Sequence, residues 1–297
     1  MNKTIIEKIL SEEILEWSKL GSGICNTVYK ATTNKNSYSI KVATVDSVTK
    51  ESNSILVEAQ ITKELQTKNP TLLIPKIIYI DPKGTFFIYR FIDSLPLGIG
   101  NNEKYINTLL STMGEFHHSI DCIYKNTACN VVGIKEYTLD DFFNKYGYEV
   151  EKYIKDKQLP EDYRYVLQIA LDLFNNTKNN QTHEQILHND IHGDNILVNA
   201  SGELDVVIDF GDAVWGDVHL DMMWYVHGYP YDWLKVVDSY EKVSGLRISC
   251  EKLIALACIR FARGLCQWYL EGEELDHCNE KIRDYKYLLK NIYTLQK

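Results

Sequence analysis

Two short motifs near residue 200 constrain this chain more than any other feature of its sequence. Residues 188–195 read His-Asn-Asp-Ile-His-Gly-Asp-Asn, which has the form H-x-D-x-x-x-x-N, and they run directly into the apolar segment 196–198. The apolar segment 206–208 then ends in the triplet Asp-Phe-Gly at 209–211. A D-F-G triplet alone is common by chance, but both motifs at this spacing, each beside a strand-like run, are far more specific. A polar turn between two strands, with a satisfied histidine, is the weaker explanation.

The two motifs supply three oxygen-bearing side chains, Asp190, Asn195 and Asp209. Transfer of a phosphoryl group needs one carboxylate that orients the attacking hydroxyl and accepts its proton. It also needs oxygen ligands that hold Mg²⁺ against the phosphates, because Mg²⁺ takes few protein oxygens and keeps its other positions for phosphate and water. We therefore predict that Asp190 is the catalytic base and that Asn195 and Asp209 bind Mg²⁺.

The character of the chain changes near residue 93. Before it, apolar and alternating runs bounded by turn residues predict strands, with one main helix over 51–67. The predicted strands are 14–20, 27–31, 37–42, 75–80 and 85–91. After it, helical spacing dominates, over 103–120, 138–155, 160–177, 231–243 and 249–271. We predict an α+β fold with a small β-rich part, 1–93, and a larger, mostly helical part, 94–297.

Composition and charge argue against several classes of protein. The formal net charge is −9, opposite in sign to that of a nonspecific nucleic-acid binder or a binder of anionic membranes. The chain has no 18-residue run of uncharged apolar residues, and glutamates interrupt its N-terminal segment as they would not in a signal peptide. Seven scattered cysteines without a C-x-x-C pair fit a reducing cytosol, with Cys258 and Cys266 as buried thiols. We expect a cytoplasmic monomer without nucleic-acid or membrane partners.

The segments 188–195 and 208–221 resemble the aminoglycoside phosphotransferase and choline kinase family of the protein-kinase-like fold. The first resembles the Brenner-type catalytic loop of that family, with Asn189 where protein kinases usually have arginine. The second resembles the continuation in which a Gly-Asp pair and a further aspartate follow, here Gly216-Asp217 and Asp221. No A-P-E segment follows, which argues against a protein substrate. The resemblance spans residues 18–225 and implies a bilobal fold with a nucleotide-binding N-lobe and a catalytic, substrate-binding helical C-lobe.

The resemblance also implies a loop that covers the nucleotide. Gly21, Ser22, Gly23 and Val28 match this loop, although Asn26 stands where G-x-G-x-x-G has its third glycine. Any glycine-rich hairpin produces such a pattern, so the assignment of this loop depends on the residues of the strand that follows it.

Lys41 lies on that next strand and matches the lysine that pairs the α and β phosphates. Glu58 on the following helix lies near the apolar stripe of that helix, which suits an ion pair with Lys41. Glu51 and Glu64 are the rival partners, and a solvated helix face is the alternative.

The segment 88–93 matches the hinge that meets the purine base. The alignment with the family assigns Tyr89 as the residue that guards the base pocket, Arg90 as its neighbour, and Ile92 as the backbone donor. A bulky side chain at this position excludes one binding pose of the purine, so we consider GTP as well as ATP as the phosphate donor. An ordinary amphipathic strand is the alternative.

The sequence identifies the acceptor site less specifically than it identifies the catalytic and metal-binding residues. An aminoglycoside carries several ammonium groups and would need carboxylates, whereas choline would need an aromatic box. The candidates for a cationic acceptor are Asp140, Asp141, Asp217, Trp268, Glu271 and Glu274, together with Glu273 and Asp276 of the same acidic run. The aromatic candidates are Trp224, Tyr225, Tyr229, Tyr231, Trp233, Trp268 and Tyr269. Solvated helix faces and core aromatics are the respective alternatives.

Several other polar residues of the motifs have structural interpretations. In the family, the position of His188 supports the catalytic loop through backbone contacts, and Asp221 braces that loop. His117 and His118 match a helix end and indicate packing, while His192 and Asp194 receive no role.

The preferred function is a small-molecule kinase that transfers the γ-phosphate of ATP or GTP to a hydroxyl of a cationic acceptor, an aminoglycoside antibiotic. Such an enzyme would confer antibiotic resistance. A choline, ethanolamine or other small-alcohol kinase is the alternative. A nucleotide-binding pseudokinase is a third hypothesis, and the presence of Lys41, Asp190, Asn195 and Asp209 argues against it.

Overall fold

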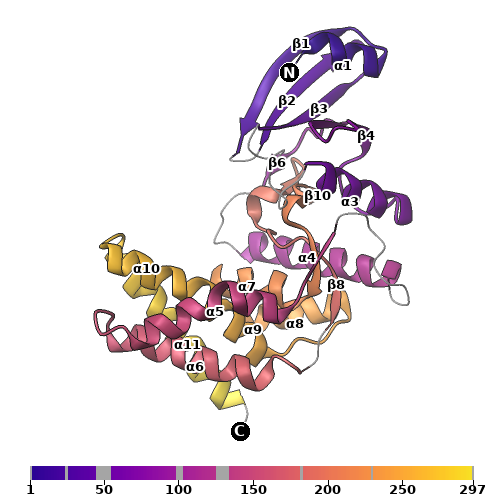
Figure 1. The fold of residues 1–297 in the computed structure, drawn as a ribbon. Coiled ribbons are helices and arrows are strands. Elements are labelled where there is room, and N and C mark those ends of the chain that lie inside the picture. The colour runs from indigo at the N-terminus through magenta and orange to yellow at the C-terminus, as the bar shows by residue number, and fades with distance from the viewer. Residues whose placement is uncertain are drawn as a thin grey trace. The chain divides into compact units, whose positions relative to one another are not determined.

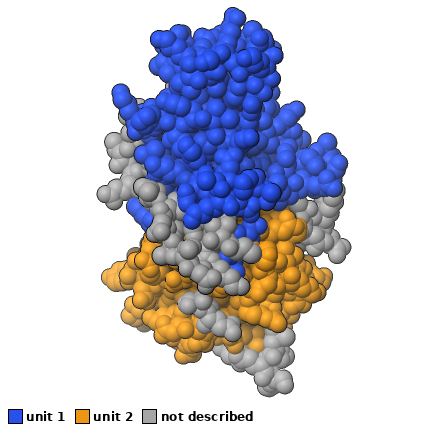
Figure 2. Space-filling model, turned by 90° about the vertical axis from the view of Figure 1, so that its right-hand side faces the viewer, with its two compact units in different colours: residues 1–109, 119–135, 188–214 blue, residues 110–118, 136–187, 215–297 orange. Residues whose placement is uncertain are grey.

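A computed structural model describes residues 2–23, 26–44, 55–97, 103–124, 134–180, 183–228 and 230–295 (Figure 1). The side chains of 103–110, 122–124 and 293–295 are not described. The chain forms two compact units, coloured separately in Figure 2. Unit 1 comprises 1–109, 119–135 and 188–214, and unit 2 comprises 110–118, 136–187 and 215–297.

An antiparallel five-stranded sheet forms the N-terminal part of unit 1, in the order β1-β2-β3-β5-β4. Its strands are β1 (Ile14–Ser22), β2 (Asn26–Thr33), β3 (Ser37–Ala43), β4 (Ile77–Ile80) and β5 (Phe86–Arg90). All five predicted strands are present, within three residues of the predicted bounds. The turn residues between them place the strand ends well, because glycine, asparagine and proline interrupt each apolar run.

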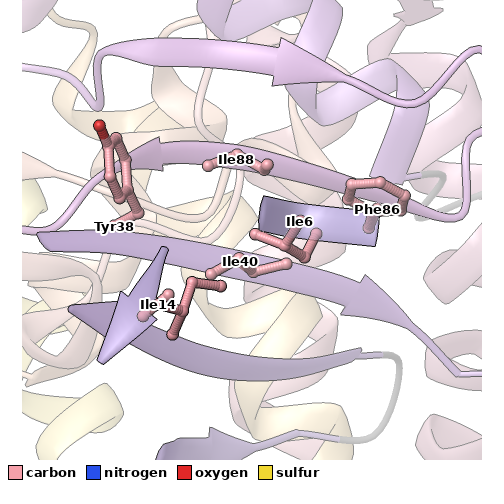
Figure 3. Packing of buried hydrophobic residues seen from close by; sticks show 7 residues of the cluster. Ile6, Ile14, Tyr38, Ile40, Phe86 and Ile88 are labelled. Atoms are coloured by element: carbon pink, nitrogen blue, oxygen red, sulfur yellow. The ribbon is translucent and has the colours of Figure 1, made fainter. Parts of the chain in front are cut away.

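One helix packs against each face of this sheet. Helix α1 (Lys3–Leu10) contributes Ile6 to a cluster with residues of alternate positions in the strands, including Ile40 and Ile88 (Figure 3). Helix α3 (Ile55–Lys68) contributes Ile55 and Ala59 to a second cluster around Phe87. Successive strand residues point to opposite faces, so Ile88 faces α1 and its neighbour Phe87 faces α3. The predicted helix over 51–67 is α3, and its first predicted turn lies outside the described residues.

The two motifs of residues 188–211 also belong to unit 1. They flank a small sheet of β10 (Leu204–Val207), β9 (Ile196–Val198) and β6 (Leu95–Pro96), in that order. The backbone N–H of Leu97 donates to the carbonyl oxygen of Ile196 at 2.8 Å, and that of Val207 donates to Leu73 at 2.9 Å. The compact units therefore group 188–214 with the N-terminal part, and the division after residue 93 stays a prediction.

Unit 2 is mostly helical, which completes the predicted α+β fold. Its helices are the central part of α4 (Glu103–Tyr124), α5 (Leu139–Lys155), α6 (Glu161–Thr177), α7 (His219–Gly228), α8 (Trp233–Ser244), α9 (Cys250–Ala257), α10 (Arg263–Glu271) and α11 (Leu275–Leu295). A sheet of β7 (Lys135–Tyr137), β11 (Val214–Asp217) and β8 (Glu184–Leu187) accompanies them. The sequence did not predict α1 or α11.

The predicted helix over 249–271 contains a π-helical turn, Cys258–Ala262, between α9 and α10. Cys258 and Cys266 are buried free thiols, as predicted. By length and composition alone, Cys250–Glu271 is the one segment among the described residues that could cross a membrane. Just over half of its most apolar window, 56%, is buried within the protein, and the core helix of a soluble protein meets the same criteria.

Neighbouring isoleucines of α1 provide a matched test of this packing. Ile6 is fully buried, whereas Ile5 is 49% exposed. We expect Ile6→Ala to lower the free energy of unfolding by about 2–4 kcal/mol, because it leaves a cavity against the sheet. Ile5→Ala should change it by less than about 0.5 kcal/mol. Urea denaturation of both variants measures this, and equal losses would show that α1 does not pack as described.

Candidate active site

The central interaction of the site is a buried ammonium group between two carboxylates. Lys41 on β3 is 4% exposed, and its Nζ lies 2.8 Å from a carboxylate oxygen of Glu58 and 2.8 Å from Oδ1 of Asp209. Glu58 lies in the first turn of α3, so the ion pair predicted between Lys41 and Glu58 is present. The second carboxylate is that of the D-F-G motif. A buried cation requires such partners, because losing hydration alone would be very costly.

These contacts determine which groups carry charge. Burial opposes the positive charge of Lys41, but the carboxylates of Glu58 and Asp209 outweigh it and raise the pKa of Lys41 well above its ordinary value. Burial likewise opposes the charge of Asp209, and the adjacent ammonium group outweighs it, so the pKa of Asp209 is lowered. Lys41 and Asp209 are therefore both ionised at neutral pH.

Both motifs contain a residue with left-handed backbone geometry. Asn189 has φ 62° and Asp209 has φ 68°, a region that non-glycine residues rarely adopt. The amide of Asn189 donates to the carbonyl oxygen of Asp212 at 3.1 Å. His188 Nε2 lies 2.7 Å from the carbonyl oxygen of Ile208, which gives His188 the backbone contact expected of it. Such strain persists where surrounding bonds hold it, and it gathers at functional sites.

The catalytic-loop motif folds around Asn195. The side-chain Nδ2 of Asn195 donates to the main-chain carbonyl oxygen of Asp190 at 2.8 Å. The main-chain carbonyl oxygen of Asn195 accepts from the N–H of Ile208 at 2.9 Å. That second bond joins the loop directly to the strand end that precedes Asp209. His192, which received no role from the sequence, lies 3.5 Å from Oδ2 of Asp190. Its hydrogen bond to Asp190 raises the pKa of His192.

The residues at this point fit a hard cation held together with phosphate. The amide nitrogen of Asn195 is already engaged, which leaves its Oδ1 as the ligating atom, and Asp209 retains Oδ2 beyond the oxygen that contacts Lys41. Within the described ranges, no group of three His, Cys, Asp or Glu side chains is arranged to hold a metal. Mg²⁺ at Asn195 and Asp209 would thus complete its shell with phosphate and water.

The described part of the glycine-rich loop is exposed. The N–H of Gly23 donates to the carbonyl oxygen of Asn26 at 2.9 Å, and the hydroxyl groups of Ser22 and Thr27 lie 2.8 Å apart. A Cβ at Gly21 would meet no protein atom within 4 Å. Val28 is the cross-strand neighbour of Lys41. Residues 24 and 25, at the tip of the predicted loop, lie outside the described residues.

The predicted hinge residues divide between the two faces of the sheet. Tyr89 is paired in register with Ser39 and packs beside Phe87, on the face that carries Lys41. Arg90 points the other way, and its guanidinium lies 5.1 Å from the centre of the Tyr38 ring. Tyr89 therefore shares a face with Lys41, whereas Arg90 packs on the α1 side, and the base-pocket role of Tyr89 stays a prediction. Ile92 follows the end of β5.

Asp217 is buried and has two charged or polar partners within unit 2. It is 3% exposed, and its two oxygens contact Nδ1 of His219 at 2.5 Å and Nζ of Lys252 at 3.0 Å. Burial and these two partners make Asp217 a poor ligand for an acceptor ammonium group, and its acceptor role stays a prediction. The adjacent Gly216 is needed for packing, because a Cβ there would lie 2.8 Å from the carbonyl oxygen of Tyr137. The sequence did not reveal Lys252 as the partner of Asp217.

The other acidic candidates are exposed and mostly engaged locally. Asp141 forms a capping box with Thr138 at the start of α5, and Asp140 lies 3.4 Å from Nζ of Lys178. Glu271, the last residue of α10, accepts a hydrogen bond from Gln267 at 2.9 Å. Glu274 precedes α11 and has φ 44°. An acceptor role for these four residues stays a prediction.

The aromatic candidates that the structure describes lie in different environments, and Trp224 packs against Phe261. Tyr225 and Trp233 are buried in the core, whereas Tyr231 and Trp268 are exposed. Tyr269 packs its ring against Tyr163, and Tyr229 lies outside the described residues.

A buried network connects α4, α7 and α8 in unit 2. Nε2 of His117 lies 3.0 Å from Oδ2 of Asp221, and its Nδ1 lies 2.6 Å from the hydroxyl of Tyr240. Asp221 thus braces the start of α7, beside the motif continuation. The prediction that His117 and His118 end their helix was wrong, because α4 continues to Tyr124.

Removal of the buried ammonium group tests the central interaction. Burial raises the pKa of Glu58 to about 7 even beside Lys41. In Lys41→Met the cation that opposes this shift is lost, so the pKa of Glu58 in the folded protein should rise further above its value of about 4.3 in the unfolded chain. Below about pH 4.3 Glu58 is protonated in both the folded and the unfolded chain, so its burial does not oppose folding through charge. Above that pH the loss of stability in Lys41→Met grows as the pH rises. We expect a loss of about 3 kcal/mol in unfolding free energy at pH 7.5, smaller at pH 5.

The double variant Lys41→Met/Glu58→Gln is the matched control for this effect. It should recover part of the lost stability at pH 7.5 and show a weaker dependence on pH. Urea denaturation at the two pH values measures both variants. A Lys41→Met loss that does not change with pH would contradict the buried ion pair.

Comparisons with known proteins agree with this geometry. A family model described as "Phosphotransferase enzyme family" matches residues 16–252. Among solved structures, the GDP complex of wild-type aminoglycoside 2'-phosphotransferase-IIIa has 18% identity and a TM-score of 0.65, with 98% of this chain and 99% of that chain covered. Choline kinase LicA from Streptococcus pneumoniae has 17% identity and a TM-score of 0.62, with 97% and 98% covered.

A macrolide 2'-phosphotransferase type I also shares the fold, with 14% identity, a TM-score of 0.64 and 96% of each chain covered. No curated protein matches the sequence significantly. At these identities the solved structures establish the fold, and the family match extends over most of the chain. The chain is therefore a phosphotransferase and belongs to the phosphotransferase enzyme family.

Proposed function

We propose that this enzyme transfers the γ-phosphoryl group of ATP or GTP to a hydroxyl group of a small cationic molecule. The observation that carries the proposal is the position of Lys41, whose ammonium group contacts both Glu58 and the D-F-G carboxylate Asp209. This contact joins the residue suited to bind phosphates with the residue suited to bind Mg²⁺. Similar structures solved with GDP support a purine nucleotide as the donor.

Each residue of the site has a distinct proposed task. Asp190 orients the acceptor hydroxyl and takes its proton, and Lys41 holds the α and β phosphates. Asn195 and Asp209 would hold Mg²⁺, which neutralises charge on the phosphates when bound. The loop at 21–23 and Val28 would cover the nucleotide, and Tyr89 would border its base. Positioning and charge neutralisation supply most of the rate in such a reaction.

We further propose that the acceptor is an aminoglycoside and that the enzyme confers resistance to it. The net charge of −9 and the exposed carboxylates of Asp140, Asp141, Glu271 and Glu274 would attract a polycation. Structures with this fold include enzymes named for aminoglycosides. Choline kinase shares the fold as well, so choline and ethanolamine are the alternative acceptors. Free thiols at Cys250, Cys258, Cys266 and Cys278 support a cytoplasmic enzyme, which we propose acts as a monomer.

Two aspartate variants test the division of tasks. Asp190→Asn should lower kcat by a factor of about 10² to 10⁴ and leave the affinity for Mg²⁺-nucleotide nearly unchanged, because only the base is lost. Asp209→Asn should lower both kcat and the affinity for Mg²⁺-nucleotide. Turnover assays and nucleotide titrations measure the two quantities. Asp172→Asn, which alters an exposed carboxylate of α6, is the control. Full turnover by Asp190→Asn would refute the assignment of the base.

An acceptor panel tests the substrate class. ATP and GTP are supplied in parallel, with kanamycin-, gentamicin-, streptomycin- and hygromycin-type aminoglycosides, a macrolide, choline and ethanolamine. We expect turnover that depends on one class of aminoglycoside. Turnover with choline alone would identify choline as the acceptor and the aromatic candidates as its binding site. Silence with intact nucleotide binding would contradict a cationic acceptor of either kind and favour the pseudokinase.

A further inference from the structure

His192 has no task in the proposed function, although it lies beside the proposed base. Its ring nitrogen Nε2 is 3.5 Å from Oδ2 of Asp190. The side chains of His192 and Asp190 are 39% and 34% exposed, so water screens their contact only in part. Both residues belong to the segment 188–214 of unit 1, so the contact lies within one compact unit.

The other ring nitrogen of His192 is held by the backbone. His192 is the N-cap of the 3₁₀ turn Gly193–Asn195, and its Nδ1 accepts a hydrogen bond from the N–H of Asp194 at 3.3 Å. The N–H of His192 donates to the main-chain carbonyl oxygen of Asp190 at 3.1 Å. The ring is therefore fixed between the start of the turn on one side and the carboxylate of Asp190 on the other.

The bond at Nδ1 determines where the ring carries its hydrogen. An Nδ1 that accepts from a backbone N–H has no hydrogen of its own, so in the neutral ring the hydrogen is on Nε2. In the imidazolium both nitrogens carry a hydrogen. Nε2–H thus faces Asp190 in both protonation states of His192, and its ability to donate there does not depend on pH.

The two carboxylate oxygens of Asp190 have different surroundings. Oδ2 lies 3.4 Å from the donor Nδ2 of Asn195 and 3.5 Å from Nε2 of His192. Among the described residues, Oδ1 has no hydrogen bond or ion pair. The carboxylate is therefore held by one oxygen, and the other is open to a hydroxyl group.

We propose that His192 is a positioning residue for phosphoryl transfer, which holds Oδ2 of Asp190 so that Oδ1 receives the proton of the acceptor hydroxyl. The inference rests on the proposed function, in which Asp190 is the base. The hydroxyl oxygen bonds to the γ-phosphorus, the bond from that phosphorus to the β,γ-bridging oxygen breaks, and the proton passes to Oδ1. A carboxylate free to rotate would meet the hydroxyl less often in a productive orientation, which lowers the rate.

Two variants of His192 separate this task from that of the N-cap. His192→Asn keeps an oxygen that can cap the turn but is too short to donate to Asp190. His192→Gln brings an amide N–H close to the position of Nε2. We expect His192→Asn to lower kcat about tenfold or more and His192→Gln to recover most of it, with KM for the nucleotide changed less than about twofold in both. A residue that only caps the turn would give the reverse order.

A control and a double variant complete the kinetic test. Turnover is measured with the acceptor that the panel above identifies. Asp194→Asn keeps the backbone N–H that fixes the ring and removes an exposed carboxylate 3.7 Å from Nδ1, so it should change kcat by less than about twofold. Asp190→Asn/His192→Asn should have the same kcat as Asp190→Asn alone, because His192 acts through Asp190.

The outcomes distinguish this inference from the proposed function. Loss of turnover in Asp190→Asn with full turnover in His192→Asn would overturn the inference and leave the base in place. Additive losses in the double variant would do the same. Full turnover in Asp190→Asn, or silence of the whole acceptor panel, would overturn the proposed function and the inference with it.

Nitrogen NMR tests the contact without any turnover. The full-length chain is labelled with ¹⁵N-histidine and measured at about pH 9, where the rings are neutral. The pair of ring signals that is missing in His192→Gln belongs to His192. We expect these signals to show hydrogen on Nε2 and none on Nδ1. A His192 ring with its hydrogen on Nδ1 would contradict the contact with Asp190, whatever the kinetics show.

Discussion

The ammonium group of Lys41 lies almost out of reach of water, and its charge is stable there because two carboxylates neutralise it. Glu58 is 17 residues away along the chain and Asp209 is 168 residues away. The interaction therefore holds a strand, a helix and the D-F-G turn at one point. Loss of any one partner leaves an uncompensated charge in the protein interior, which costs more than the pair itself contributes. The rest of unit 1 is arranged around this requirement.

Backbone strain and hydrogen bonding extend the arrangement to the catalytic loop. The N–H of Ile208 donates to Asn195, and Nε2 of His188 contacts the carbonyl oxygen of Ile208. The residue that precedes Asp209 is thus bonded on both sides by the H-x-D-x-x-x-x-N segment. Asp209 can adopt its left-handed geometry because these bonds offset the local cost. Two motifs that are separate in the sequence form one rigid unit in the structure.

The sequence predicts those parts of the fold in which local pattern and tertiary environment agree. The strands of unit 1 alternate between two buried faces. Lys41 was assigned from the family resemblance, and Glu58 as its partner from the helix spacing. Helix α1 was not predicted, because Ile6 becomes a core residue only once the sheet exists to receive it. Helix α11 was not predicted, because the acidic run at its start was interpreted as a binding surface and not as the beginning of a helix. The contact of Asp217 with Lys252 was not predicted, because the two residues lie 35 positions apart and no spacing rule connects them.

The grouping of the chain into units has a consequence for synthesis on the ribosome. The polypeptide passes from one unit to the other after residues 109, 118, 135, 187 and 214. Unit 1 therefore cannot be completed until its last segment, 188–214, has been made, after most of the chain. Until then a nascent Lys41 has Glu58 but lacks Asp209, and the sheet carries an ion pair that is only half assembled. A fragment that ended near residue 93 would stay in that state, because it contains neither Asp209 nor the segment 188–214 that completes unit 1.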